Sequence, residues 1–372
     1  SGCEGEFIED ADGNLIPNPT GDNDFEGFIP GNIALVQRGT CFFSTKVVNA
    51  QAAGAAGVVI FNEGQPGRID AFTGTLGGPV ATVPAVMANY AIGEELFNLD
   101  QAGDVSVHLA TSTESETRET VNVLADTRRG DDDHVIVVGA HLDSVTAGPG
   151  INDNGSGTAA ILEIALQMAE LKIRPLNRVR FAFWGAEESG LLGSIDYVST
   201  LPEKELDKIA LNLNFDMVGS PNFVRFVYDG DGSAGLSDPG PPGSAEIEQV
   251  FLDYFEEQGL QTEPTAFDGR SDYGPFLAFN IPAGGLFSGA EEIKSPEQAA
   301  IYGGTAGVAF DPCYHQACDT FDNNSNEVLD QFSDAAAHSV LKFAIEGLQV
   351  QTTPLKTASM NMLDYKGPHL RR

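Results

Sequence analysis

The sequence is poor in basic residues. It contains 20 Lys+Arg against 54 Asp+Glu among 372 residues, which gives a formal net charge of −34 and a sequence pI near 4.2. A chain this acidic repels nucleic acid and anionic membranes, so we predict neither as a partner. The plain interpretation of the charge is a strongly solvated surface, as in secreted or salt-adapted proteins. Attraction of cationic substrates is the alternative, and net charge alone does not support it.

Long apolar runs are also missing. No stretch approaches the roughly 20 apolar residues that a membrane-spanning helix needs. Residues 1–20 lack the charged-then-apolar pattern of a signal segment, so any export signal was removed or never existed. The length exceeds one ordinary domain and is enough to bury a large core.

Cysteines are few: four in all, at positions 3, 41, 313 and 318. The last two lie in CYHQAC, a short loop that a disulfide could close, and pairing Cys3 with Cys41 would leave no odd thiol. An even count in separated pairs favours an oxidising compartment, so we expect a secreted, extracellular protein. Four cysteines nevertheless allow three pairings, and the sequence does not choose among them.

Residues 1–111 form a predicted separate unit. Strand-like runs at 32–40 and 57–62 flank an alanine-rich helix at 42–55, and 84–99 repeats the strand, turn and helix. We find no acid–base or ligand cluster in this unit. The stretch GNIALVQRGTCFFSTKVVNAQAAGAAGVVIFN resembles the protease-associated (PA) domain, a small lid-like module inserted in several exopeptidases. The resemblance implies a smaller, β-rich α/β domain.

Residues 112–350 alternate strand and helix patterns, which predicts an α/β fold with a mixed, mostly parallel sheet flanked by helices. The acidic triplet 131–133, between two strand-like runs, is predicted to be an exposed turn. Residues 351–372 are basic, contain two prolines, and are predicted to be a C-terminal tail or linker outside the core.

Chemically active side chains follow several predicted strands. His141 and Asp143 follow the apolar run 134–140, Glu187 and Glu188 follow 178–184, and Asp216 ends 208–216. Each has an ordinary structural explanation when taken alone: a hydrogen-bonded histidine, a solvated helix start or a cap. Their recurrence at strand ends is what favours a site, because parallel strands place those ends at one edge of a sheet.

Two further residues complete a candidate metal site. Asp153 lies in the loop that opens a predicted helix at about 157–171, and His315 lies in the cysteine-bounded loop. Two imidazoles and three carboxylates are a poor match for structural zinc, which prefers closed thiolate-rich sites. They suit a pair of divalent metals about 3.5–4 Å apart that share a carboxylate and a water. Glu187, beside Glu188, is available as the base, so the pattern predicts metal-assisted hydrolysis of an acyl bond.

Several motifs carry a close resemblance to a known family. GAHLDSVTAGPGINDNGSG, FAFWGAEESGLLGS, LNFDMVGSPN, DGRSDYGPF and FDPCYHQACDT look like the M28 family of dizinc aminopeptidases. They are particularly similar to the secreted leucyl-type aminopeptidases of streptomycetes. The resemblance covers roughly residues 120–348 and implies the zinc exopeptidase fold with two Zn²⁺ ions per chain.

The family pattern assigns the metal ligands residue by residue. It implies that Asp153 bridges the two zincs, that His141 and Asp216 complete one site, and that Glu188 and His315 complete the other. A cis peptide bond after the bridging aspartate, here Asp153–Asn154, is common in the family.

The same resemblance assigns supporting roles. Glu187 is the implied general base, and Tyr314 the implied hydrogen-bond donor to the oxyanion. Asp143 is implied to orient His141. Arg270 matches a residue that helps hold the N-terminal end of the substrate, although a salt bridge with Asp268 or Asp272 explains it equally well. For Tyr314, packing within its loop is the alternative.

Asp330 and Asp334, one helical turn apart, match calcium ligands of the streptomycete relatives, so Ca²⁺ is a further predicted ion. Acidic residues on the first turns of a helix are the equal alternative. Family members begin with helices and an edge strand before the PA insert, whereas this sequence opens at the insert. We therefore expect a leading segment that was cut away, that is present as a separate chain, or that the numbering omits.

Our hypothesis from the sequence is a secreted dizinc aminopeptidase. It would remove N-terminal residues, large and apolar ones by resemblance, from peptide or protein substrates through attack by a metal-bound hydroxide. A carboxypeptidase or dipeptidase of the same family is the first alternative. A non-catalytic, receptor-like ectodomain that kept the fold is the second, and such proteins typically lose metal ligands that this sequence retains.

Overall fold

A computed structural model describes residues 2–3, 7–9, 15–17, 23–39, 41–65, 68–74, 76, 78, 80–103, 105–112 and 118–346, with the backbone alone at 7–9 and 15–17. The chain divides into two compact units between Arg118 and Glu119. The prediction for residues 351–372 lies outside the described residues. None of the described helices has the length and apolarity that crossing a membrane requires.

The first unit is built on a three-stranded parallel sheet in the order β3-β4-β5. β3 and β4 are rich in valine and isoleucine, as strands buried on both faces are, and α1 packs its apolar face against them. Val47, Val58 and Ile60 are therefore fully buried. A disulfide joins Cys3 to Cys41. The elements of this unit are β1 (Phe7–Glu9), β2 (Leu15–Pro17), β3 (Ile33–Gln37), α1 (Phe43–Ala52), β4 (Gly57–Phe61), β5 (Ala85–Ala88) and α2 (Tyr90–Ala102).

The second unit is built on a seven-stranded sheet in the order β11-β10-β12-β9-β7-β8-β6. The four neighbours β12, β9, β7 and β8 are mutually parallel, whereas β6 pairs antiparallel with β8, and β10 antiparallel with β12. This arrangement confirms the predicted mixed, mostly parallel sheet. The strands are β6 (Val123–Asp126), β7 (Asp131–His141), β8 (Asn177–Trp184), β9 (Ile209–Phe215), β10 (Phe226–Tyr228), β11 (Glu263–Thr265) and β12 (Ala283–Phe287).

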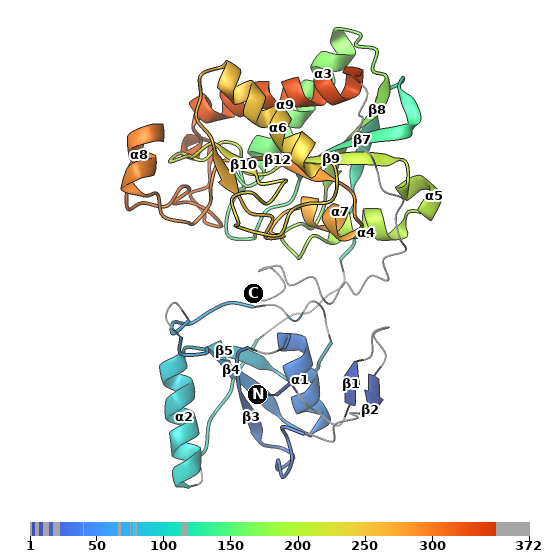
Figure 1. Cartoon of the computed structure of the whole chain (residues 1–372). Helices are drawn as coiled ribbons and strands as arrows, with labels where there is room; N and C mark the ends of the chain where they lie inside the picture. Colours follow the sequence, from blue (N-terminus) through green and yellow to red (C-terminus); the bar gives the residue numbers. More distant parts are fainter. Residues whose placement is uncertain are drawn as a thin grey trace. The chain divides into compact units, whose positions relative to one another are not determined.

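Helices cover both faces of this sheet (Figure 1). One face packs against α3, α6 and α9 through a large apolar core that includes Ile161, Phe251 and Phe332. The other face packs against α4, α5 and α7 around Trp184 and Phe276. The helices are α3 (Gly155–Glu170), α4 (Leu192–Thr200), α5 (Glu203–Leu206), α6 (Ser244–Glu257), α7 (Tyr273–Ala278), α8 (Pro296–Tyr302), the 3₁₀ turn η1 (Phe321–Asn323) and α9 (Asn326–Glu346).

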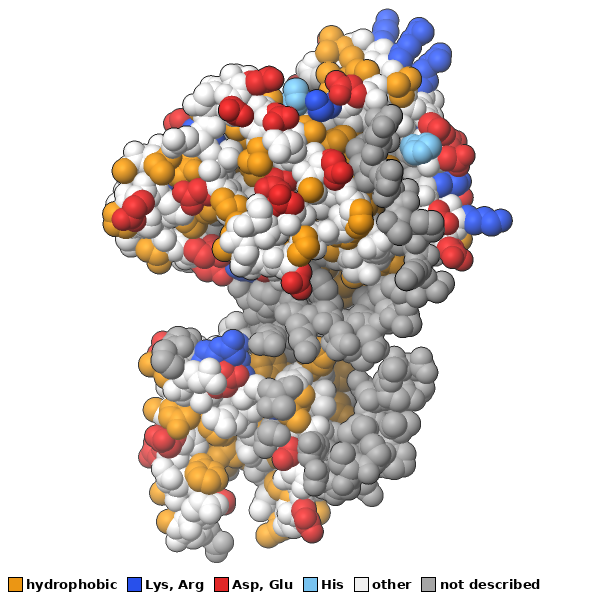
Figure 2. Space-filling view, in the orientation of Figure 1, with side chains coloured by type: hydrophobic (Ala, Val, Ile, Leu, Met, Phe, Trp, Pro, Cys, Tyr) orange, Lys and Arg blue, Asp and Glu red, His pale blue; other side chains and the backbone are white. Residues whose placement is uncertain are grey.

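The acidic triplet 131–133 is exposed, but the prediction that it forms a turn is wrong. These residues begin β7, and Asp131 pairs with Asn177 before a register shift leads into the buried part of the strand. The bend lies just before them, where Gly130 adopts a left-handed φ of 114°. Acidic side chains are also scattered over the visible face of the second unit (Figure 2), as a solvated surface requires.

Candidate metal and catalytic site

Three neighbouring parallel strands deliver the polar residues to one edge of the sheet. His141 is the last residue of β7, Glu187 and Glu188 follow β8, and Asp216 follows β9 directly. The register pairs His141 with Trp184 on β8 and Gly139 with Asn214 on β9, so the three strands end at the same level. Apolar, β-branched residues hold the strands in the core, and the side chains beyond them meet at the edge.

Asp153 lies between the two imidazoles. Its Oδ1 is 3.2 Å from Nε2 of His141, and its Oδ2 is 3.2 Å from Nε2 of His315. Asn154, the next residue, caps α3 by accepting a hydrogen bond from the Gly157 N–H, and the Asp153–Asn154 peptide bond is cis, as the resemblance implied. One carboxylate therefore faces a histidine with each of its oxygens.

Each imidazole also faces a second carboxylate. Nε2 of His141 is 3.3 Å from Oδ1 of Asp216, and Nε2 of His315 is 3.0 Å from Oε2 of Glu188. The potential ligand atoms form two groups, His141 with Glu187 and Asp216, and Asp153 with Glu188 and His315, each within 4.8 Å. The structure therefore brings the five residues with predicted ligand roles together around Asp153.

The charges of the site require a positive partner. Four buried or half-buried carboxylates face two imidazoles, which leaves net negative charge inside the protein even with both imidazoles protonated. Burial alone would lower the pKa of His315, but the carboxylates of Asp153 and Glu188 outweigh burial and raise it to about 9. Oε1 of Glu188 is buried without a hydrogen-bond partner. Mixed nitrogen and oxygen donors with an unused buried oxygen fit divalent metal ions.

Glu187 differs from the other carboxylates. It is 4 % exposed, and burial raises the pKa of its carboxyl group well above the ordinary value, against the opposing effect of His141. Neither of the two histidines approaches Glu187 within the ion-pair distances found for Asp153, Asp216 and Glu188. A carboxylate with a raised pKa beside the potential ligands suits proton transfer.

Asp143 positions its neighbours in two ways. Nδ1 of His141 lies 3.0 Å from the backbone carbonyl oxygen of Asp143, and its distance to Oδ1 of the side chain is 3.7 Å. The Asp143 carboxylate instead accepts the backbone N–H groups of Glu187, at 2.9 Å, and Glu188, at 3.1 Å. The backbone of Asp143 thus orients the histidine, and its side chain fixes the glutamate pair.

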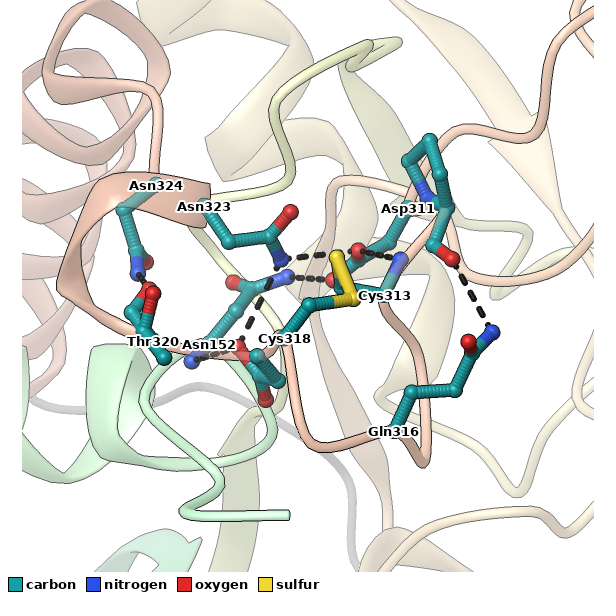
Figure 3. The surroundings of a disulfide bond; sticks show 10 residues. Asn152, Asp311, Cys313, Gln316, Cys318, Thr320, Asn323 and Asn324 are labelled. Atoms are coloured by element: carbon teal, nitrogen blue, oxygen red, sulfur yellow. Dashed lines mark hydrogen bonds between the residues drawn. A yellow bond between two sulfur atoms is a disulfide. The ribbon is translucent and has the colours of Figure 1, made fainter.

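Two residues that the sequence did not single out, Asp311 and Asp319, tie the His315 loop to Asn152 and Asp153. Asp319 accepts the backbone N–H groups of Asn152, at 2.8 Å, and Asp153, at 3.1 Å. Asp311 accepts from the Asn152 side chain at 2.7 Å, and a disulfide joins Cys313 to Cys318 (Figure 3). In the sequence, both cysteines lie between the two aspartates. The signal was available, because both aspartates flank the paired cysteines within FDPCYHQACDT.

Replacing Asp319 by asparagine should weaken metal binding without removing a ligand. Asp319 is 1 % exposed, and each of its two oxygens accepts one of the backbone N–H groups of Asn152 and Asp153. An asparagine side chain has only one acceptor oxygen, so one N–H group would lose its partner. We expect a loss of about 10–100-fold in zinc affinity, measured by competition with a chromophoric chelator. Asp322→Asn, an exposed change in the same loop, is the matched control, and equal affinities in the two variants would contradict this role.

Tyr314 and Arg270 contact each other. Nη2 of Arg270 donates to the Tyr314 hydroxyl at 3.1 Å, and the Tyr314 ring stacks on His315 with centroids 3.8 Å apart. The guanidinium pairs with Glu291, at 2.9 Å, and Glu292, at 3.4 Å. The contact of Arg270 with Asp268 comes from its backbone N–H.

Asp272, the other expected partner of Arg270, points elsewhere. It is fully buried, its Oδ1 accepts from the Ser194 hydroxyl at 2.5 Å, and its Oδ2 has no hydrogen-bond partner. Burial raises the pKa of Asp272 to about 7. The predicted salt bridges of Arg270 with Asp268 or Asp272 are therefore replaced by pairs with two glutamates.

Asp330 and Asp334 lie on the exposed side of α9. Within the described residues, neither belongs to a group of three potential ligands. The calcium site at these positions stays a prediction.

Comparison with known families decides the relationship. Residues 122–340 match the family model for peptidase family M28, which is more than half of the chain. The chain belongs to peptidase family M28. In addition, residues 3–96 match the PA domain, so the M28 unit of this chain is preceded by a PA unit.

Relatives of this M28 chain include named aminopeptidases. The aminopeptidase of Pseudomonas aeruginosa is 50 % identical over 87 % of this chain, and leucine aminopeptidase 2 of Trichophyton rubrum is 47 % identical over 86 %. The chain spans 60 % of the length of the first and 64 % of the second.

Solved structures agree on the fold. The aminopeptidase from Aneurinibacillus sp. strain AM-1 is 29 % identical with a TM-score of 0.66, and a zinc aminopeptidase from Bacillus subtilis is 27 % identical with a TM-score of 0.59. Each similarity covers 89 % of this chain and 74 % of the solved one.

Proposed function

We propose that this chain is the catalytic part of a metal-dependent aminopeptidase. The observation that carries the proposal is the Asp153 carboxylate, which faces His141 with one oxygen and His315 with the other, each at 3.2 Å. The names of the relatives, aminopeptidase and leucine aminopeptidase 2, support the reaction, and the zinc aminopeptidase of Bacillus subtilis supports the metal.

Two zinc ions would share Asp153. His141 and Asp216 would complete one site, and Glu188 and His315 the other. When bound, the metal would polarise the scissile carbonyl and lower the pKa of a water molecule that it binds. These ligand sets would be a poor match for structural zinc, which prefers thiolate-rich sites.

The remaining side chains would move protons and hold the substrate. Glu187 accepts a proton from the attacking water and returns it to the leaving amine. Tyr314, whose hydroxyl is oriented by Arg270, donates a hydrogen bond to the developing oxyanion. Arg270 itself, neutralised by Glu291 and Glu292, helps to position the N-terminal end of the substrate.

The proposal extends to substrate and location. A preference for large apolar N-terminal residues is supported by the name of the Trichophyton relative. Secretion is supported by the two disulfides, which persist in oxidising compartments.

A comparison of two substrates tests the reaction. The zinc-loaded chain should hydrolyse leucyl anilide and leave an N-blocked dipeptide intact, because the proposed reaction begins at a free N-terminus. Aspartyl anilide is the control for side-chain preference and should react more slowly. Cleavage of the blocked dipeptide alone would replace the aminopeptidase by a carboxypeptidase or dipeptidase. A chain that holds no metal and cleaves neither would point to the non-catalytic alternative.

A further inference from the structure

We propose a calcium site at the loop that joins β10 to α6, separate from the metal pair described above. Asp229 and Asp231 lie at the start of this loop, and Glu248 lies on α6. Each of the three carboxylates offers an oxygen within 4.8 Å of those offered by the other two. No residue of the site described above belongs to this group.

Burial makes the group costly without a cation. Asp229 is 0 % exposed and Glu248 is 8 % exposed. Oδ2 of Asp229 accepts the Ala234 N–H at 3.1 Å, but its Oδ1 is buried and has no hydrogen-bond partner. An ionised carboxylate oxygen that has lost its water and has no donor needs a positive charge nearby.

In the described part of the chain, no basic side chain forms an ion pair with this group. No lysine, arginine or histidine there lies within salt-bridge distance of these three carboxylates. Oε2 of Glu248 accepts the N–H groups of Gly230, at 2.9 Å, and Asp231, at 3.2 Å, which brings the loop onto α6. The backbone thus gathers the acidic groups, and a bound cation would balance them.

The donor atoms select calcium. All three side chains offer oxygen, whereas zinc prefers nitrogen and sulfur ligands. Asp229, Asp231 and Ser233 alternate with small residues in the sequence DGDGSAG, the spacing at which calcium loops place their first three oxygen donors. Asp231 and Ser233 are exposed, so water can complete the coordination. Ca²⁺ accepts six to eight oxygen ligands in a flexible geometry, whereas Mg²⁺ requires a near-ideal octahedron of six.

The position of the loop gives the ion a role. The Asp229 N–H donates to the Thr265 carbonyl at 2.9 Å, and the Phe267 N–H donates to the Ser237 hydroxyl at 3.1 Å. Tyr228, next to Asp229, stacks on Phe267 with centroids 5.2 Å apart. Calcium would therefore fix the loop against the segment that leads from Phe267 to Arg270. The site itself does not depend on the peptidase function.

Calcium titration of the zinc-loaded full chain tests the site. In calcium-free buffer, added Ca²⁺ should bind by calorimetry and raise the unfolding temperature. Asp231→Asn and Glu248→Gln should each weaken calcium binding at least about tenfold, because the affinity of a calcium site follows its ligand charge. Asp231 is exposed, so its substitution should leave the fold intact. Glu256→Gln, the same change at an exposed position of α6, should bind Ca²⁺ like the parent chain.

A second variant pair separates this site from the one predicted on α9. The double change Asp330→Asn and Asp334→Asn should leave the calcium affinity of the β10–α6 loop unchanged. If that double variant loses the binding that Asp231→Asn and Glu248→Gln retain, the proposed site is wrong. It is equally wrong if no calcium binds at about 1 mM, the weak end of extracellular sites, or if Mg²⁺ binds in preference. Leucyl anilide turnover without calcium binding would reject this site and leave the proposed function standing.

Discussion

Replacing Glu187 by glutamine should lower kcat for leucyl anilide by about 10²–10⁴-fold while the metal content stays unchanged. Glutamine keeps the size of the side chain and the backbone hydrogen bond that Glu187 makes to Asp143, but it cannot accept a proton. The buried position gives Glu187 its raised pKa and excludes water that might replace it as the base. Steady-state kinetics with metal analysis of the same sample measures both quantities.

The neighbouring glutamate provides the matched control. Glu188→Gln makes the same chemical change one residue away, where Oε2 lies 3.0 Å from His315, and should lower the metal content together with the rate. Glu163→Gln, an exposed change on α3, should alter neither. Full turnover in Glu187→Gln would remove Glu187 from the mechanism.

The strands and the ligands they carry were predictable because local patterns define both. Uninterrupted apolar runs such as 134–140 are typical of strands buried on both faces, and the first polar residue after each run marks the edge of the sheet. His141, Glu187 and Asp216 follow from this rule, whereas the choice of Glu188 over Glu187 as the ligand came from the family resemblance. The helix after Asp153 was expected from about residue 157 and begins at Gly155, because the Asn154 side chain caps it.

The residues that hold the ligands were less accessible to sequence reasoning. Asp319 acts on Asp153 across 166 positions of the chain, and Asp311 acts on Asn152 across 159. A carboxylate that accepts backbone N–H groups leaves no periodic pattern, so the place of the two aspartates beside the cysteines marks them as candidates, but only the folded chain reveals their partners. The same limit applies to the group around Asp229, which depends on α6 bringing Glu248 back to the loop.

Replacing Asp153 by asparagine should remove both metal ions together. The two oxygens of Asp153 face different histidines, so a single substitution reaches both sites. An asparagine offers one oxygen and one NH2 group, and the NH2 group would face an imidazole or repel a cation. We expect zinc affinity at both sites to fall by at least about 10–100-fold, and turnover to fall to background with it.

Single-site changes give the contrast that makes this prediction specific. Asp216→Asn should weaken the site of His141, and Glu188→Gln should weaken the site of His315. When free zinc is limiting, each of these two variants should retain one zinc ion per chain. Zinc content by elemental analysis, measured at one free zinc concentration for all three variants, distinguishes the two patterns. A chain with Asp153→Asn that retains one tightly bound zinc would mean that Asp153 serves only one ion. The two histidines would then belong to sites that bind metal independently of each other. Asp153 would not couple the two sites.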